Sequence, residues 1–351
     1  MWGAASVIPL ELNTKRKASL VWSMHMQIAS AAIPNNLLQA NVTQIVPIFS
    51  GGGTRLSAHI GIIKALQDMD VGFDTLVGVS GGSIIASLYA KGYTVEQMRE
   101  LALVTDFKQF TEFSLVRLLR EGGLSSGDVF QRWIDEQLEG AVFADLPLNL
   151  HILATDVNGG GPVLFNKQTS PDMKVSEAVR YSMSIPLIFS FKPFKEHLLV
   201  DGAILSEDAL FEDWRGDGTP SVCFRLQSTE QKRKAIKKNL LQLPQYVSML
   251  IRTFMTAISR EYVNAKYWHN TVVVNTGEIS AVDFSLTPEI KNTLFELGYA
   301  TTKEFLQKVC GIYEKQCTLT VSESNYKSLA LTLYKSRDTS RQTLLRLFQH
   351  R

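Results

Sequence analysis

The sequence is poor in cysteine, with only Cys223, Cys310 and Cys317 among 351 residues. An odd and sparse set of this kind does not suggest a disulfide framework, and the step of seven residues between the last two does not match the spacing of metal ligands. We therefore expect reduced thiols, which are typical of a cytoplasmic protein.

Long apolar runs and a strong net charge are also missing. No stretch reaches the roughly 18 consecutive apolar residues that a membrane span needs. The net charge is only +2, so global electrostatics give no reason to expect a nucleic-acid partner. Residues 15–32 superficially resemble a signal peptide, but His25 and Gln27 interrupt the apolar stretch. Its apolar residues recur at helical spacing, which favours an amphipathic helix.

From residue 44 onward, short β-branched runs alternate with helical patterns. Such alternation predicts an α/β fold with a mostly parallel sheet, whose ligand sites lie at the carboxyl ends of the strands. We divide the chain into an N-terminal helical extension (1–43), a central domain (44–310) and a C-terminal extension (311–351). Strands are expected at residues 44–49, 75–79, 148–155, 197–200, 221–226 and 271–275, and helices at 59–69 and 83–91.

A G-x-S-x-G sequence, Gly78-Val79-Ser80-Gly81-Gly82, lies between a predicted strand and a predicted helix. This is the context of a nucleophile elbow, a sharp turn whose small flanking residues let the strand and helix approach each other. The serine hydroxyl then lies at a helix N-terminus, where free N–H groups favour developing negative charge. The pentapeptide alone also fits a glycine-rich turn that has no catalytic role. The prediction of a nucleophile therefore depends on the strand and the helix predicted on either side of it.

A glycine triplet, Gly51, Gly52 and Gly53, follows the first predicted strand. Adjacent glycines can direct neighbouring N–H groups into one concavity, either as a phosphate cradle or as an oxyanion hole. The spacing is not that of the P-loop motif G-x-x-x-x-G-K-[ST]. It does not match the dinucleotide-binding motif G-x-G-x-x-G either, because Leu56 stands where the third glycine would be needed. The serine elbow therefore favours the oxyanion hole. Arg55 either adds positive charge near the hole or pins the loop through a salt bridge.

Asp201 ends a short apolar strand and precedes Gly202. An Asp-Gly step normally marks a turn. A serine hydroxyl, however, needs a base, and a carboxylate whose pKa is raised in a water-poor pocket can serve as one. Ser80, Asp201 and His269 would give a histidine triad, but no loop signature surrounds His269. We favour Asp201 as the base and interpret His59 as a residue at the start of a helix.

In this order the three motifs resemble those of patatin-like phospholipases. Further matches occur at residues 123–127, 143–147, 154–157, 176–186 and 191–193, so that the resemblance covers about residues 44–310. It implies a three-layer α/β/α fold and a catalytic dyad of Ser80 and Asp201 without histidine. It also implies an oxyanion hole formed by the N–H groups of Gly51, Gly52 and Gly53, helped by Arg55.

The activity that the resemblance implies is hydrolysis of fatty-acyl esters in phospholipids or lysophospholipids through an acyl-enzyme intermediate. No metal and no organic cofactor are implied. Leu56 and Ala203 stand where many family members have glycine. These departures motivate a second hypothesis, a binding or regulatory protein on a catalytically silent scaffold. A third is an esterase or acyltransferase that acts on smaller acyl esters.

A lipid substrate requires access to a membrane surface. Five basic residues within positions 232–238 precede an apolar helical stretch at 240–258, which fits either an interfacial binder of anionic lipid or a charge run before a core helix. The two terminal extensions are candidates for contact with an activating partner or a small signal. We expect a cytoplasmic protein that associates peripherally with membranes, and we leave open secretion as an effector and the oligomeric state.

Overall fold

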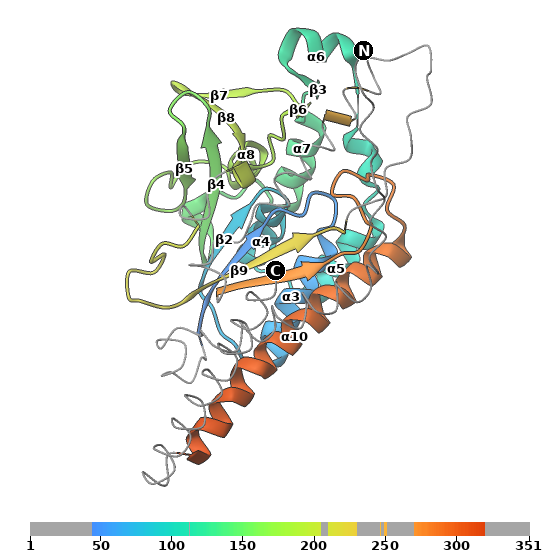
Figure 1. Ribbon diagram of the computed structural model, residues 1–351. Coiled ribbons are helices and arrows are strands. Elements are labelled where there is room, and N and C mark those ends of the chain that lie inside the picture. The colour runs from blue at the N-terminus through green and yellow to red at the C-terminus, as the bar shows by residue number, and fades with distance from the viewer. Residues whose placement is uncertain are drawn as a thin grey trace, which may run out of the picture. The chain divides into compact units, whose positions relative to one another are not determined.

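The computed structural model describes residues 44–111, 113–204, 210–229, 246, 249–250 and 270–319, with side chains of the last helix as far as Lys308 (Figure 1). The predictions for residues 1–43, 232–238 and His269 lie outside the described residues, as does most of 240–258 and of 311–351. The chain divides into two compact units, residues 1–302 and 303–351. The boundaries predicted near residues 43 and 310 stay predictions, and the site described below lies within the first unit.

A mixed sheet of eight strands organises the described part of the first unit (Figure 1). Its order is β10 (Thr271–Asn275), β9 (Ser221–Gln227), β1 (Val46–Ser50), β2 (Thr75–Val79), β4 (Asn149–Asp156), β8 (His197–Asp201) and β7 (Lys192–Phe194), with β5 (Gly161–Phe165) also paired to β4. The strands from β10 to β4 run parallel, whereas β5, β8 and β7 pair antiparallel. A separate parallel pair joins β3 (Gly123–Ser125) to β6 (Leu187–Phe189).

The described helices are α3 (Ser57–Asp68), α4 (Gly81–Lys91), α5 (Val95–Val104), α6 (Leu115–Glu121), α7 (Asp128–Gln137), α8 (Val175–Ser182) and α10 (Pro288–Leu319). Short 3-10 helices occupy Phe107–Phe110, Phe143–Asp145 and Gly202–Ile204. The predicted α/β fold with a mostly parallel sheet is confirmed, and the predicted strands and helices agree with the observed ones to within two residues at each end.

The central strands are apolar and buried on both faces, as parallel sheets require. All five residues of β1 and all five of β2 are buried. On one face, α4 packs against both strands and against α8. On the other face, a cluster that includes Val46, Ile48 and Val77 packs against Leu210 and Trp214.

The strand register brings distant residues to one place. Val79 of β2 pairs with Leu153 of β4, and the next residue, Ala154, pairs with Asp201 of β8. Because β8 is antiparallel to β4, its first residues lie beside the carboxyl end of β4, and its last residue, Asp201, lies only one residue beyond the partner of Val79. Ser80 follows directly after Val79, so this register brings Ser80 and Asp201 together.

Candidate active site

Ser80 forms a strained turn between β2 and α4. Its φ of 54° and ψ of −132° lie in a region that residues other than glycine rarely adopt. Two hydrogen bonds hold this turn. The N–H of Ser80 donates to Oγ of Ser182 at 2.8 Å, and the hydroxyl of Ser182 in turn donates to the carbonyl oxygen of Leu153 at 2.7 Å. The geometry is that of the predicted nucleophile elbow. Ser182 is a contributor that the sequence did not reveal.

The three elbow glycines lie where backbones approach closely. A Cβ at Gly78 would be 2.6 Å from the Cα of Ser83, and a Cβ at Gly82 would be 2.1 Å from the carbonyl oxygen of Phe49. A Cβ at Gly81 would be 2.7 Å from the backbone nitrogen of Gly53. Contacts this short leave no room for a side chain, so all three positions need glycine if strand, helix and glycine triplet are to meet.

Ser80 and Asp201 form a buried hydrogen-bonded pair. The Ser80 hydroxyl donates to Oδ2 of Asp201 at 2.7 Å, and both residues are 1% exposed. Oδ1 of Asp201 accepts the N–H of Ala203 at 2.8 Å. Burial raises the pKa of Asp201 from 3.8 to about 7, and it outweighs the two hydrogen bonds, which lower the pKa. A carboxylate that titrates near neutrality beside a hydroxyl is suited to accept its proton.

The glycine triplet forms a loop of positive φ angles beside this pair, at 68° for Gly51, 110° for Gly52 and 53° for Gly53. The N–H of Gly51 donates to the carbonyl oxygen of Val79 at 3.1 Å. Within the described part of the chain, the N–H groups of Gly52 and Gly53 have no backbone acceptor. These two groups are therefore the ones in this loop that are free to bind an oxyanion, whereas the Gly51 N–H is already occupied.

Arg55 holds the triplet loop from behind. Its side chain is buried, and Nε donates to the carbonyl oxygen of Gly52 at 3.1 Å. The other guanidinium nitrogens donate to Oγ1 of Thr276 at 2.7 Å and to the carbonyl oxygen of Leu226 at 3.3 Å. Burial lowers the pKa of Arg55 to about 10, so the group stays charged at neutral pH. Of the two interpretations left open above, pinning of the loop is observed, through hydrogen bonds to neutral oxygens. That the positive charge of Arg55 also assists an oxyanion hole stays a prediction.

His59 is a second support that sequence reasoning missed. It lies near the start of α3, as predicted, and it is completely buried. Its Nε2 lies 3.1 Å from the carbonyl oxygen of Gly51. Burial lowers the pKa of His59 to about 4, so the ring is neutral, and we assign the proton to Nε2 because a carbonyl can only accept. A histidine in an otherwise apolar helical turn was the signal available in the sequence.

Together His59 and Arg55 orient the two free N–H groups. In a trans peptide the C=O and N–H bonds point in opposite directions. His59 anchors the carbonyl of Gly51, and Arg55 anchors the carbonyl of Gly52. The N–H groups of the following residues, Gly52 and Gly53, must therefore point away from these anchors.

Comparison with known proteins identifies the family. A family model described as patatin-like phospholipase matches residues 48–211, which include the serine elbow and Asp201. The uncharacterized protein YqhO of Bacillus subtilis is 29% identical over 287 residues, covering 74% of this chain and 97% of YqhO. Residues 48–211 therefore belong to the patatin-like phospholipase family. The uncharacterized protein R571 of Acanthamoeba polyphaga mimivirus is 25% identical over 294 residues, covering 79% of this chain and 97% of R571.

Two further comparisons extend this result. A probable lipid hydrolase, 463L, of Invertebrate iridescent virus 6 is 23% identical over 172 residues, covering 45% of this chain and 59% of that protein. The crystal structure of VipD from Legionella pneumophila superposes with a TM-score of 0.50 at 15% identity, covering 75% of this chain and 67% of VipD. At this identity the likeness supports the patatin-like fold alone.

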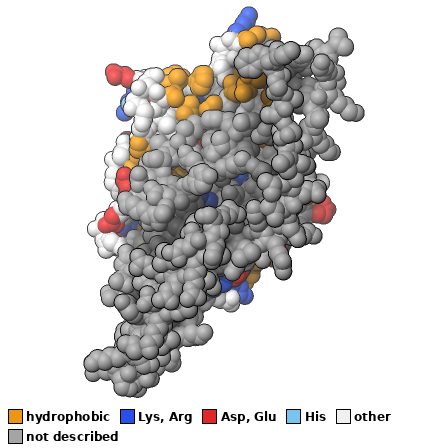
Figure 2. All heavy atoms as spheres, viewed as in Figure 1, with side chains coloured by type: hydrophobic (Ala, Val, Ile, Leu, Met, Phe, Trp, Pro, Cys, Tyr) orange, Lys and Arg blue, Asp and Glu red, His pale blue; other side chains and the backbone are white. Residues whose placement is uncertain are grey.

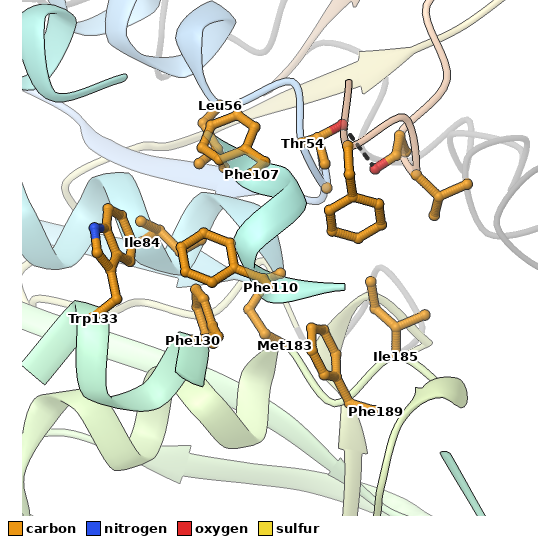
Figure 3. Close-up of a pocket in the computed structure, with 14 residues that line it drawn as sticks. Thr54, Leu56, Ile84, Phe107, Phe110, Phe130, Trp133, Met183, Ile185 and Phe189 are labelled. Atoms are coloured by element: carbon orange, nitrogen blue, oxygen red, sulfur yellow. Dashed lines mark hydrogen bonds between the residues drawn. The ribbon is translucent and has the colours of Figure 1, made fainter. Parts of the chain in front are cut away.

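An apolar pocket adjoins the patatin-like elbow (Figure 3). Met183 lines it, with its sulfur 3.8 Å from the Ser80 hydroxyl oxygen, and so does Gly53 of the triplet. The polar lining residue Thr54 has its hydroxyl bonded to the carbonyl oxygen of Ala281. The other lining residues are apolar: Leu56, Ile84, Phe107, Phe110, Phe130, Trp133, Ile185, Phe189, Ala281, Val282 and Phe284.

A second, more polar cavity is lined by Gly51, Gly52, Arg55, Ser80 and Asp201, among others. Ala281 lines both cavities. Among the residues that the structure describes, no group of His, Cys, Asp and Glu side chains is placed to hold a metal ion. The arrangement therefore combines a hydroxyl with a carboxylate, a pair of free N–H groups and an apolar chamber.

Proposed function

We propose that this chain is a lipid acyl hydrolase that cleaves fatty-acyl esters of phospholipids or lysophospholipids, with Ser80 as nucleophile and Asp201 as base. The observation that carries the proposal is the 2.7 Å hydrogen bond between the Ser80 hydroxyl and Asp201, whose pKa is raised to about 7. Family membership and the apolar pocket beside the pair support a lipid substrate.

In the first half of the proposed reaction, the Ser80 oxygen attacks the ester carbonyl carbon while Asp201 takes the hydroxyl proton. The carbonyl π electrons move to oxygen, and the N–H groups of Gly52 and Gly53 stabilise this negative charge. When the tetrahedral intermediate collapses, the bond to the leaving alkoxide breaks. Protonated Asp201 returns its proton to that oxygen, which leaves an acyl-enzyme on Ser80 and a free alcohol.

In the second half, a water molecule attacks the acyl carbon and Asp201 takes a proton from it. The oxyanion forms again in the same place. The bond between the acyl carbon and Ser80 then breaks, Asp201 returns the proton to the serine oxygen, and a fatty acid leaves. One carboxyl group thus serves as base and acid in turn, which requires a pKa near the working pH.

The apolar pocket suits the acyl chain. Met183, whose sulfur lies 3.8 Å from the Ser80 hydroxyl oxygen, lines the pocket together with aromatic side chains such as Phe110 and Phe130 (Figure 3). A chain held there would place its carbonyl carbon beside the serine hydroxyl. Burial of each methylene contributes about 0.8 kcal/mol, so this pocket favours long-chain over short-chain esters.

The two departures from the common family pattern support activity rather than a silent scaffold. Leu56 has φ −51° and ψ −35°, an ordinary right-handed conformation that does not need glycine, and its side chain lines the apolar pocket. Ala203 donates its N–H to Asp201, a bond that depends only on the backbone. Neither residue removes or displaces a reacting group.

The test compares release of fatty acid from phospholipid and lysophospholipid vesicles by wild type, Ser80→Ala and Asp201→Asn. We expect both variants to lose activity by more than about a thousandfold. Ser87→Ala is the matched control. Ser87 is a buried serine of α4, the helix that follows Ser80, and its hydroxyl donates a hydrogen bond to the carbonyl oxygen of Ser83. Ser87→Ala should retain activity. Lipid hydrolysis by Ser80→Ala would refute the proposed nucleophile.

A fluorophosphonate probe separates the alternatives, since it labels only an activated serine. Wild type should be labelled and Ser80→Ala should not. If wild type is not labelled in the presence of any vesicle, the proposal fails and the silent scaffold is favoured. Labelling together with hydrolysis of short-chain esters alone would instead favour an esterase of smaller substrates.

A further inference from the structure

Exposed apolar side chains gather on and around helix α6. None of the seven residues of α6 is buried. Leu119 is 81% exposed, Val116 60% and Leu115 41%, while the neighbouring Phe113 and Phe191 are 51% and 41% exposed. We call these five side chains the α6 surface. Figure 2 shows hydrophobic side chains along the upper edge of the molecule, where Figure 1 places α6 and β7. Contiguous apolar side chains in water mark an interaction site.

The α6 surface stands on a well-anchored base. The N–H of Ser114 donates to the carbonyl oxygen of Leu124 at 2.8 Å, and the Ser114 hydroxyl caps the helix by accepting the N–H of Arg117. Leu118, on the inner side of α6, packs against a buried cluster that includes Phe189. At the other end, the ring of Phe191 covers Gly122. The exposed side chains therefore have a fixed arrangement.

The α6 surface is continuous with the apolar pocket. The ring of Phe113 packs edge-to-face against Phe284, with the ring centroids 6.1 Å apart, and Phe284 lines the pocket. Phe189, which lies beneath α6, also lines the pocket. Apolar contacts thus run from the exterior at α6 to Met183, which touches Ser80. An acyl chain that entered the pocket from this surface would therefore meet apolar side chains.

Basic side chains border the same surface. Arg120 is exposed on the same helix and directly follows Leu119 in the chain. Arg117 faces Glu121, the acidic residue of the helix, at 3.7 Å, and Glu121 also accepts the Ser190 hydroxyl. The helix therefore carries one more basic than acidic side chain, beside exposed leucine and valine. Apolar residues flanked by arginine suit an interface with anionic lipid.

We propose that the α6 surface docks on a lipid bilayer that carries anionic headgroups, with Val116 and Leu119 inserted among the acyl chains. The inference rests on the proposed function, because it brings a bilayer to the apolar surface that adjoins the pocket beside Ser80. A protein partner fits less well, since a standard protein interface takes roughly 20–30 residues from each side and the α6 surface has five. The continuity with the acyl pocket also favours lipid over a second copy of this chain.

The first experiment measures binding apart from catalysis. Full-length chain carrying Ser80→Ala is mixed with vesicles of phosphatidylcholine, with and without phosphatidylglycerol, and the bound fraction is measured by flotation. Adding Leu119→Asp should weaken the partition coefficient by about tenfold or more, since it replaces an apolar side chain with a charge. Val157→Asp is the matched control, because Val157 is a 53% exposed valine in the turn after β4 and is not one of the five side chains of the α6 surface. It should bind as the parent does.

Equal binding by the parent and the Leu119→Asp chain overturns the proposal, and so does an equal loss in the Val157→Asp chain. A change of oligomeric state on gel filtration with vesicle binding intact also overturns it, in favour of a second copy of the chain. Thermal unfolding of each variant checks the fold, which a side chain as exposed as Leu119 should leave unchanged.

The second experiment uses the active chain. Leu119→Asp should lower the ratio of vesicle hydrolysis to short-chain ester hydrolysis by the same factor as the partition coefficient, and Val157→Asp should leave this ratio unchanged. An unchanged ratio in Leu119→Asp overturns the role of the α6 surface in substrate access. If no ester is cleaved but vesicle binding still depends on Leu119, the proposed function fails and the docking surface stands.

Discussion

Asp201→Asn should remove activity and at the same time stabilise the folded chain above neutral pH. Asp201 is buried, and its pKa lies about three units above the ordinary value of 3.8. Each unit corresponds to about 1.4 kcal/mol, so the ionised carboxylate lowers the free energy of unfolding by about 4 kcal/mol. Asparagine carries no charge and keeps an oxygen that can accept the Ala203 N–H. The variant should therefore recover most of this free energy.

The raised pKa of Asp201 determines how the gain in stability of Asp201→Asn should change with pH. In the unfolded chain Asp201 loses its proton above pH 3.8, whereas the folded chain holds the proton up to about pH 7. Folding therefore becomes less favourable between these values, and the penalty is constant above them. The difference in unfolding free energy between Asp201→Asn and wild type should be near zero below pH 4. It should grow to about 4 kcal/mol at pH 8.

Urea denaturation of both chains from pH 4 to pH 8 measures this difference. Asp156→Asn is the control with the opposite sign. Asp156 accepts hydrogen bonds from His197 and from the backbone of Asn158 and Gly159, and these lower its pKa. Its replacement should therefore destabilise the chain by an amount that stays constant from pH 4 to pH 8 and that disappears only at lower pH, below the ordinary pKa of 3.8. If the gain in unfolding free energy of Asp201→Asn is the same at every pH, burial does not raise the pKa of Asp201 and the reasoning is refuted.

The same pKa fixes the pH profile of the proposed hydrolysis. Only the ionised carboxylate can take the Ser80 proton, so kcat/KM of wild type should rise tenfold per pH unit below about pH 7 and level off above it. A midpoint near pH 4 would show that Asp201 is solvated in the working enzyme. Hydrolysis by Asp201→Asn at any pH in this range would show that another group is the base.

Two further predictions concern residues around the dyad. His59→Ala removes the donor to the Gly51 carbonyl, so kcat should fall by roughly ten- to a hundredfold with KM nearly unchanged, and His59→Gln should restore part of the loss; a proportional rise in KM would instead indicate a binding role. Ile84→Trp fills part of the apolar pocket, so the ratio of long-chain to short-chain ester hydrolysis should fall; an unchanged ratio would place the acyl chain elsewhere.

The local part of the fold could be predicted from the sequence because its signals are local. Residues 75–79 and 271–275 are strands at the predicted positions, since short apolar β-branched runs in each case adjoin glycine or polar residues. Helix α4 begins at Gly81 rather than at residue 83. Glycine has a low helix propensity, but the strained turn at Ser80 forces the chain into the helix at once.

The meeting of Ser80 with Asp201 depends on strand pairing that no local pattern encodes. The antiparallel register of β8 against β4 places Asp201 beside Ala154, one residue beyond the partner of Val79. The antiparallel strands β5 and β7 were not predicted either, since pairing direction follows from tertiary packing. The sequence pointed to Asp201 through the need of the elbow serine for a base and through the order of the motifs that carries the family resemblance.

The sequence favoured Asp201 over a histidine as the catalytic base, and the environment of His59 gives the physical reason, which the sequence could not supply. A histidine does lie beside the oxyanion loop, yet its Nε2 contacts the Gly51 carbonyl, and burial lowers its pKa to about 4. The same burial raises the pKa of Asp201 to about 7. Burial disfavours the charged form of both groups, so it moves the imidazole away from neutral pH and the carboxyl towards it. In this site the carboxylate titrates where a catalytic histidine usually would, and the neutral histidine is left to hold the loop.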